Sequence, residues 1–184
     1  MKTIGVMSYQ GAGHLHINAL KKLGFEALPV YAWTDFSKTD GLILPGGESS
    51  VQYNYCLSSG LKRKILQYSL TKKPILGTCA GAILLSQYPS EKVKGFGLIN
   101  MGIIRNFYGR QIKSTTVKSD NNNEIVFIRA PAIEDIGDEV TVFDTYMQKP
   151  VFVKQNNIYC TTFHPELGRL DQSNIIYMIF KGLI

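Results

Sequence analysis

The sequence predicts an α/β fold in three layers, with a mixed, mainly parallel β-sheet between two layers of helices. The first half alternates short apolar runs with amphipathic segments, an order typical of βαβ crossovers. The second half is a series of strand-like runs separated by turn residues. A length of 184 residues, with 45% apolar and 18% charged side chains, suits a single globular domain over residues 1–184.

The first half of the chain contains strand-like runs that alternate with helical patterns. The expected strands lie at residues 3–8, 27–32, 40–44 and 74–78. The expected helices lie at residues 15–23, 61–70 and 80–86, and a further helix is expected to begin after Glu48. Gly24 suits the position after the first helix because glycine readily adopts a left-handed conformation. Helical connections of this length imply parallel pairing of the strands.

The second half predicts strands with few helices between them. The strand-like runs lie at residues 98–104, 111–118, 124–129, 140–146, 151–153 and 158–163. Because turn residues separate them, we expect antiparallel additions to the sheet. A closing helix is expected over residues 172–181, with apolar side chains on its inner face.

Composition and charge exclude several classes of protein. The net charge is +6, but short basic runs such as Lys62-Arg63-Lys64 are typical of solvated helix faces, so no nucleic-acid partner is expected. The longest apolar stretch, over residues 74–85, is too short to span a membrane. No secretion signal is indicated, and three cysteines without metal-ligand spacing predict neither a disulfide framework nor a metal site. The reducing cytoplasm is therefore the expected compartment.

No cofactor motif is found. Gly11 and Gly13 follow the first strand as in a dinucleotide fingerprint, but His16 stands where the third glycine belongs. A dinucleotide site is therefore not expected.

Gly77-Thr78-Cys79-Ala80-Gly81 joins an apolar strand to an apolar helix. This context is typical of a G-x-nucleophile-x-G elbow, where small flanking residues permit a sharp turn that projects the nucleophile. At a helix N-terminus, the helix dipole and the free N–H groups stabilise a thiolate. Cys79 is therefore a candidate nucleophile, and the alternative is a buried structural cysteine.

Phe163-His164-Pro165-Glu166 directly follows a strand-like run. In an extended segment, residues two apart point to the same side, so His164 and Glu166 can project together. A carboxylate beside an imidazole sets its tautomer and favours its protonated form, as an acid–base catalyst requires. These residues can complete a Cys–His–Glu triad, although a lone histidine on a strand is more often structural.

Leu44-Pro45-Gly46-Gly47-Glu48-Ser49 follows the third strand. Adjacent glycines let backbone N–H groups approach a ligand closely, as an oxyanion hole requires. Glu48 is placed to bind a cationic amino group. The alternative is a plain turn in which Glu48 complements the dipole of the following helix.

Together these segments resemble the class I (triad) glutamine amidotransferases, in which a glycine-rich oxyanion strand, a G-x-C-x-G elbow and an HPE segment occur in this order. Further segments resemble more specifically the glutaminase subunit of pyridoxal 5′-phosphate synthase, and this resemblance covers nearly the whole chain. These segments are Gln10-Gly11, Arg105-Asn106-Phe107-Tyr108-Gly109-Arg110-Gln111, Phe127-Ile128-Arg129-Ala130-Pro131 and Phe163-His164-Pro165-Glu166-Leu167.

The resemblance implies a three-layer, flavodoxin-like class I glutamine amidotransferase fold and a cytoplasmic enzyme that hydrolyses L-glutamine to L-glutamate and ammonia. The ammonia would pass to a (β/α)8-barrel synthase subunit that makes pyridoxal 5′-phosphate from a pentose phosphate and a triose phosphate. It also implies that the catalytic residues are Cys79, His164 and Glu166. The implied glutamine-binding residues are Gly46, Gly47, Glu48, Arg105, Ile128 and Arg129, with oxyanion donors at the N–H groups of Gly47 and Ala80.

The first helix departs from the family pattern. The family usually carries Arg-Glu-His where this chain has His14-Leu15-His16, and that region faces the partner in the family. We expect His14 to be exposed, whereas the place of His16 is left open. Cys56 and Cys160 are interpreted as packing residues.

Two alternative functions stay open. One is a stand-alone cysteine hydrolase or protease of the related elbow-bearing superfamily, although Glu48, Arg105 and Arg129 favour an amino-acid substrate. The other is a non-catalytic regulatory subunit, against which the intact triad argues.

Overall fold

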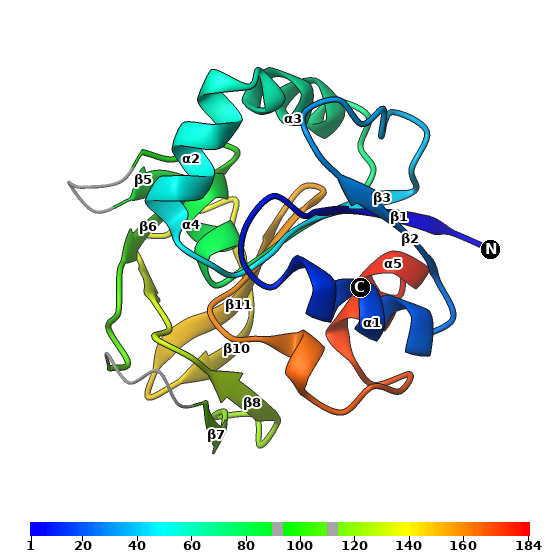
Figure 1. Ribbon diagram of the computed structural model, residues 1–184. Helices are drawn as coiled ribbons and strands as arrows, with labels where there is room; N and C mark the ends of the chain where they lie inside the picture. The colour runs from blue at the N-terminus through cyan, green and yellow to red at the C-terminus, as the bar shows by residue number, and fades with distance from the viewer. Residues whose placement is uncertain (90–93, 110–113) are drawn as a thin grey trace.

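The computed structural model describes residues 1–89, 94–109 and 114–184. At its centre lies a seven-stranded sheet (Figure 1). In spatial order its strands are β10 (Thr141–Tyr146), β11 (Lys149–Gln155), β12 (Ile158–Thr161), β4 (Ile75–Thr78), β3 (Gly41–Leu44), β1 (Thr3–Met7) and β2 (Glu26–Val30). The five strands from β12 to β2 are parallel, and β11 and β10 continue the sheet in antiparallel fashion.

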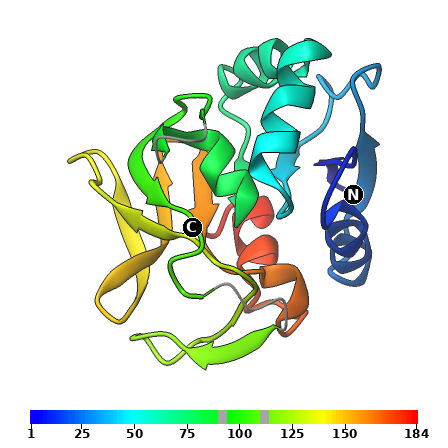
Figure 2. The same ribbon diagram turned by 60° about the vertical axis from the view of Figure 1, so that its left-hand side comes forward.

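Helices cover both faces of this sheet, as Figures 1 and 2 show. On one face lie α1 (Gly13–Lys22) and α5 (Ile175–Lys181), and on the other lie α2 (Ser49–Ser58), α3 (Leu61–Ser69) and α4 (Ala80–Leu85). The layers follow from the alternation of side chains along a strand. In β3, Ile43 packs with α1 and α5, whereas Leu42 and Leu44 pack toward α2, α3 and α4. The predicted mixed, mainly parallel sheet with helices on both faces is therefore confirmed.

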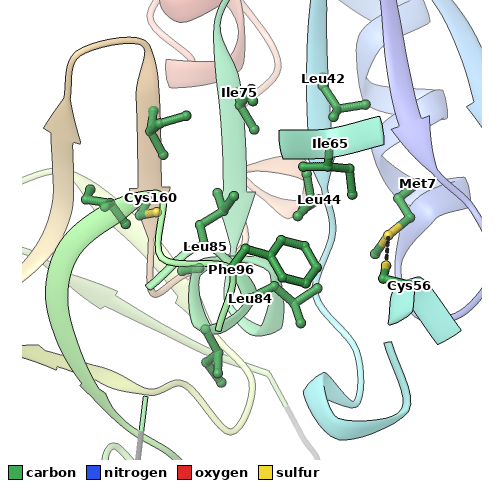
Figure 3. Close-up of a cluster of buried hydrophobic side chains, with 14 of the residues drawn as sticks. Met7, Leu42, Leu44, Cys56, Ile65, Ile75, Leu84, Leu85, Phe96 and Cys160 are labelled. Atoms are coloured by element: carbon green, nitrogen blue, oxygen red, sulfur yellow. Dashed lines mark hydrogen bonds between the residues drawn. The ribbon is translucent and has the colours of Figure 1, made fainter. Parts of the chain in front are cut away.

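A cluster of buried apolar side chains fills the space between the central sheet and the helices α2, α3 and α4. Figure 3 shows Leu44 of β3, Ile75 of β4 and Leu84 of α4 in this cluster. In the same cluster Cys56 donates a sulfur hydrogen bond to Met7 at 3.6 Å. Both Cys56 and Cys160 are fully buried here, in agreement with their interpretation as packing residues.

The expectation that every strand of the second half joins the central sheet was wrong. A separate three-stranded sheet contains β5 (Ser86–Pro89), β6 (Ile99–Ile104) and β9 (Ala132–Glu134), and β7 (Thr115–Lys118) pairs only with β8 (Glu124–Phe127). In addition, β12 is parallel to β4, not antiparallel. A strand-like pattern fixes an extended conformation but does not specify which strand will supply its hydrogen-bond partners.

Element boundaries also differ from the expected ones. The strands β5 and β9 were not predicted, and of the strand expected at 111–118, residues 111–113 lie outside the described residues. The helix expected after Glu48 is α2. The closing helix begins only at Ile175, because the Asn174 side chain accepts a hydrogen bond from the N–H of Ile176 at 2.9 Å and caps it there.

Within residues 1–89, 94–109 and 114–184, no helix has both the length and the apolar character needed to cross a membrane.

We predict that Phe180→Ala destabilises the protein strongly. Phe180 is among the largest fully buried side chains of the described residues, and its ring packs against Gly41. Its removal therefore leaves a cavity between α5 and the sheet. The loss should be about 3–5 kcal/mol, measured by denaturant unfolding. Leu183→Ala is the control because Leu183 is 63% exposed, and it should change stability by less than about 0.5 kcal/mol. Equal losses for the two variants would contradict this packing.

Candidate active site

The chain makes a sharp, strained turn at Cys79. Cys79 lies between β4 and α4 with φ of 51° and ψ of −105°, a conformation that is strained for any residue other than glycine. Its N–H donates to the carbonyl of Thr161 at 2.8 Å, and its carbonyl accepts from the N–H of Ile83. The strained turn is thus anchored to the end of β12 and to the first turn of α4.

The two glycines of the elbow are required by close backbone contacts. A Cβ on Gly77 would lie 2.7 Å from the carbonyl oxygen of Gly81, and a Cβ on Gly81 would collide with the carbonyl of Leu44. Side chains at either position would force α4 away from β4 or β3. The spacing of the sequence motif therefore reflects a physical need of the fold.

The strand β12 delivers His164 and Glu166 to the same sheet edge as the elbow. Because β12 is parallel to β4, the carboxyl ends of the two strands lie side by side at the same edge of the sheet. Nδ1 of His164 lies 2.8 Å from Oε1 of Glu166, and both residues are buried. The N–H of His164 donates to the carbonyl of Val126 at 2.9 Å, which ties this segment to β8.

The charge balance around His164 favours the imidazolium. Burial disfavours the charged form, but interactions with Cys79 and Glu166 outweigh it and raise the pKa of His164 to about 10. Nε2 of His164 is buried and has no hydrogen-bond partner among the described side chains. It therefore stays available to exchange a proton with a group in the adjacent cavity.

Cys79 and His164 converge on Gly46. A Cβ on Gly46 would lie 2.6 Å from Cε1 of His164 and 3.5 Å from Cβ of Cys79. Only glycine leaves space between the loop after β3 and these two side chains.

A cavity of about 200 Å³ opens at this point. It is smaller than the pockets that hold drug-sized molecules, so it suits a small ligand. Cys79, Ala80 and His164 line it, whereas Glu166 lies behind His164. The structure brings all the residues predicted to bind substrate to its wall: Gly46, Gly47, Glu48, Arg105, Ile128 and Arg129.

An ion pair forms the polar wall of the cavity. Nη2 of Arg105 lies 2.5 Å from Oε1 of Glu48, and the hydroxyl of Ser50 donates to the same oxygen at 3.0 Å. Burial acts to raise the pKa of Glu48, but Ser50 and Arg105 outweigh it and hold this pKa below its ordinary value. The wall thus presents a fixed negative and a fixed positive charge side by side, both partly open to solvent.

Backbone strain is concentrated around the cavity. Besides Cys79, the lining residues Asn106 and Arg129 have positive φ values, of 54° and 47°. The segments that carry them are joined by a hydrogen bond from the N–H of Tyr108 to the carbonyl of Ala130. Strained non-glycine residues are often found where function fixes a backbone shape, which supports a functional site here.

Gly47 and Ala80, whose N–H groups are the predicted oxyanion donors, both line the cavity together with Cys79. Ala80 begins α4, so its N–H belongs to the first turn, where helices leave donors without an intrahelical acceptor. Gly47 lies in the loop after β3, which is held by the Gln10 side chain accepting from the N–H of Glu48 at 3.1 Å and by Gln52 donating to Pro45.

The sequence did not identify every residue of the site. The lining residues that it missed are Ala12, Ser49, Ile83 and Asn106. The exposed position expected for His14 is correct, whereas His16 is fully buried and lies beside Glu166. The sequence gives one indication that His16 is buried, its position on the apolar face of an amphipathic helix. This position does not indicate that His16 contacts Glu166.

Comparison with known proteins defines the class of protein first. A solved structure described as a glutamine amidotransferase superposes with a TM-score of 0.85 at 30% identity, covering 98% of this chain and 97% of the other. The PurLQS structure from Thermotoga maritima matches with a TM-score of 0.70 at 20% identity, which supports the fold alone. The fold is that of the class I glutamine amidotransferases, as the sequence predicted.

The family model for the SNO glutamine amidotransferase family matches residues 6–181, and the chain belongs to this family. Pyridoxal 5′-phosphate synthase subunit PdxT of Caldicellulosiruptor saccharolyticus is 43% identical over 175 residues, covering 91% of this chain and 92% of that protein. The same subunit of Thermoplasma acidophilum is 42% identical over 174 residues, covering 89% and 85% of the two chains. The prediction of a glutaminase subunit of pyridoxal 5′-phosphate synthase is confirmed, and the protease alternative is not supported.

We predict that Glu166→Gln lowers the pKa of His164. Removing the carboxylate charge removes one of the interactions that stabilise the imidazolium, so the pKa should fall well below about 10. The Cε1–H resonance of His164, followed by NMR against pH, measures this. Glu26→Gln, at an exposed residue of β2, should leave the titration unchanged. An unchanged titration in Glu166→Gln would contradict the described geometry.

The same shift predicts the pH dependence of stability. Because the pKa of His164 lies above its ordinary value of 6.5, the charged imidazole contributes stability that is fully present below pH 6.5 and is lost as the pH rises through about 10. The melting temperature should therefore fall between pH 7 and pH 10, and Glu166→Gln should reduce the part of that fall due to His164. An identical pH dependence in both proteins would be the contrary result.

Proposed function

We propose that the protein hydrolyses L-glutamine to L-glutamate and ammonia with Cys79 as nucleophile, His164 as general acid and base, and Glu166 as the group that orients His164. The observation that carries this proposal is the arrangement of Cys79 and His164 around a small cavity whose wall holds the Glu48–Arg105 pair. We further infer that residues 1–184 act as one glutaminase domain, because both apolar clusters pack on the same central sheet.

The first half of the reaction forms a covalent intermediate. The sulfur of Cys79 attacks the side-chain amide carbon of glutamine, and its proton is held by Nε2 of His164. The N–H groups of Gly47 and Ala80 stabilise the oxyanion that develops. The C–N bond then breaks, His164 gives its proton to the departing nitrogen, and ammonia leaves a γ-glutamyl thioester on Cys79.

The second half regenerates the enzyme by the same groups in reverse. His164 takes a proton from water, and the resulting hydroxide attacks the thioester carbon. The C–S bond breaks, glutamate is released, and the sulfur of Cys79 recovers its starting state. Glu166 keeps the imidazole in one orientation through both halves, since it stays bound to Nδ1.

The charged wall explains the choice of an amino-acid substrate. The α-ammonium group of glutamine fits Glu48, and its α-carboxylate fits Arg105 and Arg129. Because Glu48 and Arg105 are paired with each other, the two charges already stand at the spacing of adjacent ligand groups. This preformed pair supports a zwitterionic ligand over a peptide, which lacks free α-groups within the chain.

We propose that the ammonia passes to a (β/α)8-barrel synthase subunit, which uses it to build pyridoxal 5′-phosphate. The relatives named as subunits of pyridoxal 5′-phosphate synthase support this partner.

We also propose the cytoplasm as the compartment. Three free, buried cysteines fit a reducing environment.

We predict that Cys79→Ala abolishes glutamine hydrolysis but still permits complex formation with the synthase subunit. Ammonia release is measured with and without the synthase, and complex formation is measured by co-purification. Cys56→Ala is the matched control because Cys56 is buried away from the cavity, and it should keep its turnover. Turnover by Cys79→Ala would remove the proposed nucleophile, and wild-type protein without turnover in either condition would favour the regulatory-subunit alternative.

We predict that Arg105→Gln lowers kcat/KM for glutamine by about ten- to a hundredfold, the effect of losing a charged hydrogen bond of about 1.5–3 kcal/mol. The loss should appear mainly in KM if Arg105 binds ground state and transition state alike. Arg63→Gln, at an exposed residue of α3, should change neither constant. Unchanged kcat/KM in Arg105→Gln would contradict its role in binding.

A further inference from the structure

A second histidine lies behind the proposed triad. His16 projects from α1 and is fully buried. Its Nε2 lies 3.2 Å from Oε2 of Glu166 and 3.0 Å from the hydroxyl of Thr78. Since Oε1 of Glu166 is bound by His164, the two oxygens of one buried carboxylate face two different imidazoles.

The charge of Glu166 selects the tautomer of His16. If Nε2 were unprotonated, its lone pair would face the carboxylate oxygen Oε2 at 3.2 Å, and the two would repel each other. A proton on Nε2 instead places a positive edge toward both Oε2 and the Thr78 oxygen. Burial lowers the pKa of His16, with His164 acting in the same direction and Glu166 opposing it, so the ring is a neutral donor.

The contacts of His16 join the two halves of the site. Thr78 is the residue before Cys79 in the elbow, and Glu166 belongs to the short helical turn after β12 (Pro165–Leu167). In the described part of the chain Oε2 of Glu166 has no hydrogen-bond partner of good geometry, and its ion-pair contact is Nε2 of His16 at 3.2 Å. Loss of this imidazole removes the 3.2 Å contact from Oε2, so rotation about the terminal bond of the carboxylate becomes easier.

We propose that His16 is a positioning residue. It holds the carboxylate of Glu166 in the orientation in which Oε1 accepts a hydrogen bond from Nδ1–H of His164. The inference rests on the proposed triad, because it assigns His16 a role only through Glu166 and His164. His16 touches neither the cavity nor the reacting atoms, so its effect falls on the chemical step and not on glutamine binding.

Three substitutions separate this role from simple packing. His16→Gln places an amide N–H near the position of Nε2, whereas His16→Asn places it near the position of Nδ1, away from Glu166. His16→Phe keeps a ring of similar shape without any donor. His14→Gln is the control on the same helix, because His14 is exposed.

The test measures kcat and KM for glutamine hydrolysis in the complex with the synthase, the melting temperature, and the NMR titration of His164. We expect His16→Phe and His16→Asn to lower kcat by about ten- to a hundredfold with KM within about twofold, and to lower the pH at which His164 titrates. His16→Gln should recover most of the lost turnover, and His14→Gln should match the wild type.

Equal turnover in the Asn and Gln variants, or a loss that follows melting temperature with the His164 titration unchanged, would overturn the positioning role. If His16→Phe fails to fold, the comparison of the two amides still decides. Wild-type protein without turnover would instead refute the proposed function. Normal wild-type turnover, an inactive Cys79→Ala and an unaffected His16→Asn would refute only this inference.

Discussion

The close approach of the Gly81 backbone to the carbonyl of Leu44 is the constraint on which the site depends. It presses the start of α4 against the end of β3, where any side chain on Gly81 would collide. The loop that carries Gly46 and Gly47 therefore leaves β3 directly beside the elbow. The strained φ of Cys79 follows from the same contact, because the chain must reverse within one residue to enter a helix held so near the sheet. This backbone contact thus sets Cys79, the proposed nucleophile, beside the loop that carries Gly46 and Gly47.

Electrostatic interactions determine the charge state of the buried pair formed by His164 and Glu166. A buried carboxylate and a buried imidazole each oppose ionisation when alone. Interactions with His16 and His164 outweigh burial and lower the pKa of Glu166, and interactions with Cys79 and Glu166 raise the pKa of His164. Breaking such a pair leaves an uncompensated buried charge, so its members depend on one another. The surrounding side chains explain why the pair can be kept dry, since His164 and Glu166 are only 6% and 5% exposed. His164 lines the cavity, so a ligand bound there can reach this side of the pair.

Sequence reasoning succeeded where a motif has a local physical cause. The spacing of Gly77 and Gly81 around Cys79, and the two-residue step from His164 to Glu166, each describe a turn or strand end that the chain makes by itself. Family resemblance then supplied Arg105, Ile128 and Arg129, which periodicity would not have identified. All of these line the cavity or support it. Their chemical roles stay predictions that the kinetic variants address.

The sequence failed where the structure depends on partners distant in the chain. Strands β6, β7 and β8 have ordinary strand patterns, yet they pair in small separate sheets because tertiary contacts choose the partner. The contact of His16 with Glu166 is of the same kind: a histidine on a short helix gives no sign of the carboxylate it will meet. Helix α5 began later than expected because a single cap at Asn174 overrides apolar periodicity.

The covalent intermediate offers the most direct test of the central claim that the elbow presents a nucleophile to a glutamine-sized cavity. The complex is mixed with glutamine, quenched in acid, and analysed by peptide mass spectrometry. We predict one γ-glutamyl group, attached to Cys79, and none on Cys56 or Cys160. A modification on another residue, or ammonia release with no thioester at Cys79 under any quench time, would contradict it.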